Sequence, residues 1–129
     1  MPAAGVQTSS AAFASQNSIE KPIRKRLTSG GAETILSVPS GGSAGSNAKK
    51  VLYLRCAVES AAGTPNFTLD VYDGTNTYIL RSSSALSAGE VYREVDILLS
   101  PGESLRGTCS TGAISVTGQY LDIGRGNNG

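Results

Sequence analysis

The sequence contains no histidine and no tryptophan, and aromatic residues make up only 5% of its 129 positions. Without histidine, a serine or cysteine nucleophile has no usual general base, and a zinc site is limited to two cysteines plus carboxylates. A Ser-Lys dyad or a carboxylate pair stays open in principle, but no spacing in the chain favours either. We therefore expect a protein without enzymatic activity, cofactor or metal.

Long apolar stretches are also lacking. No run of 18 or more apolar residues occurs, which argues against a membrane-spanning helix. The first 18 residues have neither the basic start nor the apolar stretch of a secretory signal. We expect a protein that has no membrane partner and stays where it is made.

Charge of either sign is scarce. Eleven basic and ten acidic side chains give a net charge of +1, divided into +2 for residues 1–48 and −1 for residues 49–129. Neither half has the strongly basic character typical of a nucleic-acid-binding surface, so we do not expect nucleic acid as a partner.

Only two cysteines are present, Cys56 and Cys109, and they lie 53 positions apart. Each falls within an expected strand, so the two are a candidate disulfide pair across a sheet. The alternative, in a reducing compartment, is that both are small buried thiols.

What the sequence does contain is β structure. Over residues 65–81, three apolar residues alternate with polar ones, an Asp-Gly-Thr-Asn sequence at 73–76 supplies turn residues that tolerate positive φ, and β-prone residues follow. This pattern predicts a β-hairpin.

Similar alternation recurs at short intervals after residue 33. It predicts further strands over residues 33–38, 49–59, 91–99, 105–109 and 114–123, and no segment has the apolar spacing of a helix. We expect one buried face in 49–59 and one common face in 91–99. The first is Leu52, Leu54, Cys56 and Val58; the second is Val91, Arg93, Val95, Ile97 and Leu99.

Seven or eight short strands separated by turn residues predict an all-β fold, a single antiparallel β-sandwich with either jelly-roll or immunoglobulin-like topology. We assign the sandwich to residues 33–125 and a flexible tail to residues 126–129.

Residues 1–32 are rich in alanine, serine and glycine, and their apolar residues are isolated. Because such a segment cannot bury enough apolar surface to offset its ordering entropy, we expect an extended N-terminal arm that needs a partner. The basic run at residues 21–26 lies in this arm and could contact nucleic acid or an acidic protein surface; the alternative is a solvated linker that keeps the arm soluble. The candidate partner-binding residues are Phe13, Ile19, Ile23, Arg24, Lys25, Arg26 and Leu27.

Four signatures carry a family resemblance. They are Val-Pro-Ser-Gly at 38–41, the strand at 51–58, the hairpin at 71–80 and Gly-Glu-Ser-Leu at 102–105. In this order they resemble the small β-sandwich modules of structural proteins from tailed bacteriophages. The resemblance implies a virion component assembled in the host cytoplasm. It also implies a symmetric homo-oligomer that binds other virion proteins, either the major capsid protein or portal, neck or tail proteins.

Three hypotheses follow. The first is a capsid decoration or cement protein whose N-terminal arm clamps neighbouring capsid subunits. The second is a neck, collar or tail accessory protein that forms rings. The third is a carbohydrate-binding adhesive module, for which Tyr53, Tyr72, Tyr78 and Tyr92 are the available rings, although the scarcity of aromatic residues disfavours it.

Overall fold

The structure is a computed structural model that describes residues 19–40, 48–59 and 64–123. Within these ranges it has eight strands and no helix, so none of the described residues forms a helix that could cross a membrane. The strands are β2 (Glu20–Thr28), β3 (Glu33–Ser37), β4 (Ala48–Val58), β5 (Asn66–Tyr72), β6 (Thr77–Ala85), β7 (Val91–Leu99), β8 (Ser104–Cys109) and β9 (Ala113–Ile123). The predicted fold class is confirmed.

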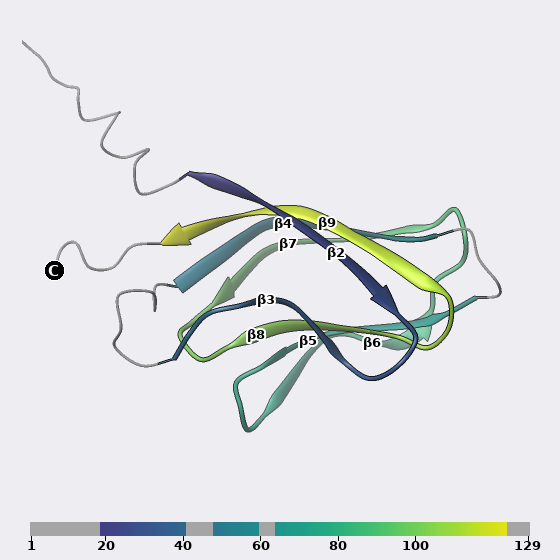
Figure 1. The fold of residues 1–129 in the computed structure, drawn as a ribbon, viewed down its shortest axis with the longest axis horizontal. Coiled ribbons are helices and arrows are strands. Elements are labelled where there is room, and N and C mark those ends of the chain that lie inside the picture. The colour runs from purple at the N-terminus through teal and green to yellow at the C-terminus, as the bar shows by residue number, and fades with distance from the viewer. Residues whose placement is uncertain (1–18, 41–47, 60–63, 124–129) are drawn as a thin grey trace, which may run out of the picture.

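The strands form two antiparallel sheets of four, with the orders β2-β9-β4-β7 and β3-β8-β5-β6. In Figure 1 the first sheet is the upper layer and the second is the lower one. Apart from the β5–β6 hairpin, each strand is followed by one in the other sheet. If the strands are lettered B to I in chain order, the two sheets read BIDG and CHEF, which is the jelly roll. The structure thus selects one of the two topologies that the sequence left open.

The predicted hairpin is present as β5 and β6. Asp73 shapes its turn, because Oδ1 of this residue accepts the backbone N–H groups of Thr75 at 2.8 Å and Asn76 at 2.6 Å. Gly74 adopts a φ of 99°, in the left-handed region that favours glycine. The turn therefore follows from side chains that the sequence already displays.

The core lies between the two sheets, where Leu54, Phe67, Leu69 and Leu105 are completely buried. Cys56 on β4 and Cys109 on β8 are buried there as free thiols, so the candidate disulfide is not formed. Both thiol groups pack among the apolar side chains of the core. The alternative of two buried thiols is the arrangement that the structure has.

Strand β2 departs most from expectation. Residues that we assigned to the N-terminal arm pair with β9 along the whole of β2, and Ile23 and Leu27 point into the core. The strand is held by hydrogen bonds to β9 on one side of its backbone and by the burial of these two side chains. The expected boundary between residues 32 and 33 therefore lies inside the sandwich. Residues 1–18 and 126–129 lie outside the described residues.

Two irregularities change which side chains face inward. The register of β4 against β9 shifts between Val51 and Tyr53, so Val51 joins the core in place of Leu52. In β7, Asp96 has a φ of 57°. The inward face of β7 changes phase at this residue, since Ile97 is buried whereas Val95 is 57% exposed. Our predicted faces were wrong for Leu52 and for the first half of β7.

Candidate protein-interaction site

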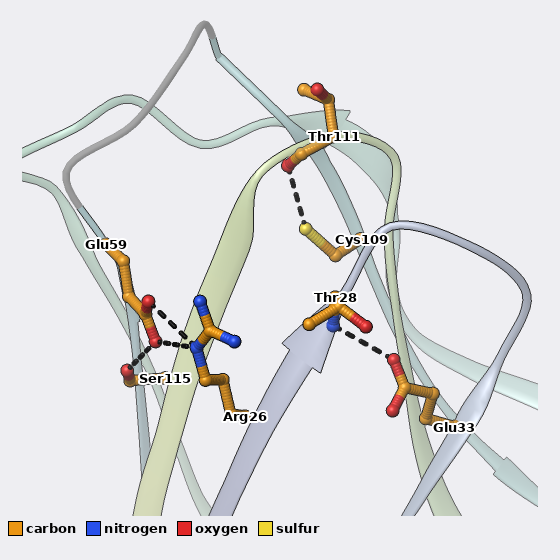
Figure 2. Close-up of polar contacts among 7 residues, drawn as sticks. All are labelled: Arg26, Thr28, Glu33, Glu59, Cys109, Thr111 and Ser115. Atoms are coloured by element: carbon orange, nitrogen blue, oxygen red, sulfur yellow. Dashed lines mark hydrogen bonds and ion pairs between the residues drawn. The ribbon is translucent and has the colours of Figure 1, made fainter.

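The basic run on β2 is largely neutralised by carboxylates of the same chain. Lys21 pairs with Asp122 at 2.5 Å, and Lys25 lies 3.4 Å from a carboxylate oxygen of Glu33. The second Glu33 oxygen accepts the backbone N–H of Thr28 at 3.0 Å, which is the main reason that the pKa of Glu33 is lowered. Figure 2 shows this contact where β2 ends.

Arg26 is held in the same way. Its Nε lies 2.9 Å from Glu59, and the Ser115 hydroxyl donates to the same carboxylate at 2.8 Å (Figure 2). These contacts, the Ser115 hydrogen bond first, lower the pKa of Glu59. Arg24 is the one cation of the run without a partner among the described residues. The run is therefore not the concentrated positive patch that its sequence displays.

The apolar candidates of the former arm have separate positions. Ile23 and Leu27 pack in the chain's own core and are not available to a partner, whereas Ile19 is 62% exposed just before β2. Phe13 lies outside the described residues. Of the candidate partner-binding residues, Ile19 and Arg24 are therefore accessible to a partner, whereas Ile23 and Leu27 are not.

A second surface, which the sequence analysis did not single out, lies between β6 and β7. These strands are the edges of the two sheets, and each has a single neighbouring strand, β5 and β4 respectively. A groove of about 480 Å³ runs between them. We call it the β6–β7 groove; its lining includes Tyr78, Leu80, Val95, Leu98, Glu94 and Glu103.

Several large apolar side chains are exposed at and beside the β6–β7 groove. Tyr78, Ile79 and Leu80 are consecutive on β6 and all exposed, and Val95 and Leu98 on β7 are 57% and 56% exposed. Natural edge strands are normally protected by charge, proline or a covering segment, and a contiguous exposed apolar patch marks an interaction site. Two strands that each have one unpaired edge beside such a patch are suited to binding an extended polypeptide.

Arg81 closes the space between the sheets elsewhere along this side. Its guanidinium lies 5.4 Å from the ring centre of Phe67 and 5.1 Å from that of Tyr92, and it donates to the Phe67 carbonyl at 2.6 Å. Such cation–π contacts stabilise a charged side chain over core aromatics. Arg81 on β6 thus contacts a ring from each sheet, Phe67 on β5 and Tyr92 on β7.

The polar groups in the described ranges form no catalytic arrangement. Tyr92 donates its hydroxyl to Glu94 at 2.7 Å, and burial together with this contact raises the pKa of Tyr92 to about 12. Asp70 is buried and pairs with Arg106 at 2.9 Å. No group of three potential metal ligands occurs among the described residues.

The four tyrosines proposed for sugar binding do not gather in one place. The Arg106 guanidinium covers the ring of Tyr72 at 4.2 Å, and Tyr92 packs edge-on against Phe67. Tyr53 and Tyr78 are exposed, but they stand on different sheets. The described residues thus supply no platform of adjacent rings.

Comparison with known proteins gives a similarity in fold. No protein-family model and no curated protein matches the sequence. Two crystal structures of a pentameric capsid protein isolated from metagenomic phage sequences, one of them solved by iodide SAD phasing, are each 19% identical with a TM-score of 0.46. The matches cover 79% of this chain and 60% and 62% of those chains, so the chain spans less than two thirds of their length.

Proposed function

We propose that this chain is a non-enzymatic structural subunit of a bacteriophage virion, and specifically a capsid decoration or cement protein. The observation that carries the proposal is the β6–β7 groove, where exposed apolar side chains adjoin the free edges of two strands. An extended segment of a neighbouring protein adds to such an edge through main-chain hydrogen bonds and places alternate side chains in the groove.

Two further arguments support a virion role. Jelly rolls are widely used by viral capsid proteins, although lectins share them, so the fold supports the proposal by analogy only. The turn and strand signatures at residues 38–41, 51–58, 71–80 and 102–105 resemble phage structural modules in particular. Weak contacts repeated by symmetry then sum to a stable attachment.

We retain the proposal that the N-terminal arm clamps capsid subunits, but for a shorter segment. Because β2 belongs to the sandwich, the proposed clamp consists of residues 1–19, with Phe13 and Ile19 as apolar anchors on neighbouring capsid subunits. Its partners are the major capsid protein or portal-proximal proteins of a particle assembled in the host cytoplasm.

A ring-forming neck or tail accessory protein is the second candidate. One observation favours it: β2 and β7 are the two free edges of a single sheet. Head-to-tail joining of such edges generates a closed ring when the rotation between subunits allows it.

Co-sedimentation with purified capsids of the parent phage tests the first candidate. We expect a variant lacking residues 1–19 to keep its β-sheet circular dichroism and to lose capsid binding. Binding that persists would refute the clamp.

The groove has its own variants. The pair Leu80→Ser and Leu98→Ser should weaken capsid binding about tenfold, because two apolar side chains that line the groove are removed. Ile123→Ser, which changes an exposed apolar residue outside the groove, is the matched control and should bind normally. Equal binding by all three proteins would refute the role of the groove, and binding of the intact chain to a glycan array in place of capsids would favour an adhesive module.

A further inference from the structure

Three arginines lie in one row across the upper sheet of Figure 1. Arg24 on β2 is in register with Thr117 on β9, Thr117 with Arg55 on β4, and Arg55 with Arg93 on β7. All three arginines are exposed. Neighbouring strands are separated by about 4.8 Å, so the arginine row extends about 14 Å over the whole width of the sheet.

The row points away from the core. Ile23 and Leu54, which precede Arg24 and Arg55 in the chain, are both buried, and Val116 is buried next to Thr117. Successive residues of a strand point to opposite faces, so the arginine side chains stand on the outer face of the sheet. This outer face meets the β6–β7 groove at the β7 edge of the sheet, where Val95 belongs to both surfaces.

These three side chains are also the described cations without a partner. The other seven described lysines and arginines each have a hydrogen bond or an ion pair: Lys21, Lys25, Arg26, Lys49, Lys50, Arg81 and Arg106. Arg24, Arg55 and Arg93 have none among the described residues. The unpaired positive charge of this part of the chain is therefore concentrated in one row.

The fold itself gains nothing from this placement. Arg55 and Arg93 are direct cross-strand neighbours, and like charges at such positions destabilise a sheet. Carboxylates neutralise most of the basic run on β2, whereas no described carboxylate pairs with the row. A counter-charge supplied by a partner would turn this repulsion into attraction.

The adjoining row identifies the kind of partner. Two positions along the strands, the same face carries Pro22, Gln119, Tyr53 and Val95 in register. Tyr53 is 44% exposed and Val95 57% exposed, and Leu98 nearby is 56% exposed. Arginine beside exposed aromatic and aliphatic side chains is the composition of a protein–protein interface. A phosphate backbone would match the arginines but would leave the apolar row unused.

We propose that the outer face of the β2-β9-β4-β7 sheet binds a protein surface on which carboxylates stand beside apolar side chains. The carboxylates pair with Arg24, Arg55 and Arg93, and the apolar groups cover Tyr53 and Val95. The proposal goes beyond the virion role, because it depends on this face alone.

An NMR titration of the full-length, ¹⁵N-labelled protein tests this assignment. The probe is a 20-residue polyglutamate peptide, and a 20-nucleotide oligothymidine is run at the same ionic strength. We expect polyglutamate to shift the Nε–Hε signals of the three arginines and the backbone amides around them. Absence of localised shifts with polyglutamate would overturn the proposal, as would tighter binding of the oligonucleotide.

Matched variants separate this site from general charge. Arg24→Gln/Arg55→Gln/Arg93→Gln should weaken polyglutamate binding about tenfold, which corresponds to three exposed ion pairs. Lys21→Gln/Lys25→Gln/Arg26→Gln removes the same charge from cations that already have partners, and it should weaken binding less than about twofold. Equal weakening by both triple variants would overturn the proposal. Self-association that only the arginine variant abolishes would support it and identify the acidic partner as a second copy of this chain.

Discussion

Gly118 provides the sharpest test of how the upper sheet is built. It lies in the central strand β9, in register with Ile23 on β2 and Leu54 on β4, beside the register shift of β4. A Cβ at this position would stand 2.2 Å from the Tyr53 carbonyl oxygen and 3.2 Å from the Leu54 Cα. Both obstacles are backbone atoms, so the strand itself would have to move by about 1 Å to reach ordinary contact.

We expect Gly118→Ala to lower the free energy of unfolding by about 3 kcal/mol, the upper part of the range for overpacking a core. Replacing glycine by alanine also restricts the unfolded chain, but this stabilises the folded protein by only about 0.4–1 kcal/mol. At about 4 °C per kcal/mol for a domain of this size, the thermal midpoint should fall by about 12 °C.

Gly107→Ala is the matched control. A Cβ there would meet side-chain atoms, the Leu27 Cδ1 at 2.7 Å and the Ile35 Cδ1 at 3.2 Å. These methyl groups can rotate away, so we expect a loss of about 1 kcal/mol or less. Urea unfolding followed by circular dichroism measures both variants, with an unchanged m-value as the sign that the denatured states are comparable. A Gly118→Ala loss that is no larger than the Gly107→Ala loss would refute the close approach of β4 and β9.

Three further predictions concern charge and thiols. Asp70→Asn should lower the free energy of unfolding by about 3 kcal/mol, because it leaves the partly buried Arg106 without its carboxylate partner. Adding Arg106→Gln should recover part of this loss. A loss below about 1 kcal/mol for Asp70→Asn in urea unfolding would contradict the prediction. Ellman's reagent at pH 8 should react slowly with the folded protein, since burial raises the pKa of Cys56 to about 12 and also raises the pKa of Cys109. After the protein is unfolded without reductant, the reagent should detect two thiols per chain. Rapid labelling of the folded protein, or fewer than two thiols after unfolding, would argue against buried free cysteines. The pKa of Glu59 is lower in the folded chain than in the unfolded chain. The contribution of Glu59 to stability is therefore complete above the unfolded pKa of about 4.3 and is lost as the pH falls through the folded pKa. Glu59→Gln should reduce the loss of thermal stability between pH 7 and pH 3, and a pH profile identical to that of the original protein would contradict the contact.

Much of the sandwich could be predicted because most of its strands have a recognisable local sequence pattern. The hairpin has an Asp-Gly turn between alternating strands, and Leu54 and Cys56 alternate with polar residues as a half-buried strand requires. Strand β2 gave a much weaker signal. The inward positions of this strand include Ile23, Lys25 and Leu27. Lys25 interrupts the apolar alternation and forms an ion pair with Glu33.

The remaining errors have a common physical origin. The bulge in β4 and the positive φ of Asp96 in β7 each reverse the facing of later side chains, and neither leaves a distinctive local pattern. The arginine row could not be foreseen either, because it depends on the register of four strands that lie far apart in the sequence. The β6–β7 groove likewise requires knowing which strands are edges.

The pairing of β2 with β9 also determines how late in synthesis the upper sheet can form. About 85 residues separate Thr28 from its partner Ala113, so a growing chain exposes the first strand long before the last one has been synthesised. Ile23 and Leu27 stay in contact with water during that interval, and pairing at such long separations is slow. Since β9 also lies against β4, a ribosome that stops before residue 113 leaves two strands of the sheet without their shared partner. The sheet can therefore close only after β9 has been synthesised, because β9 is the strand that joins β2 to β4.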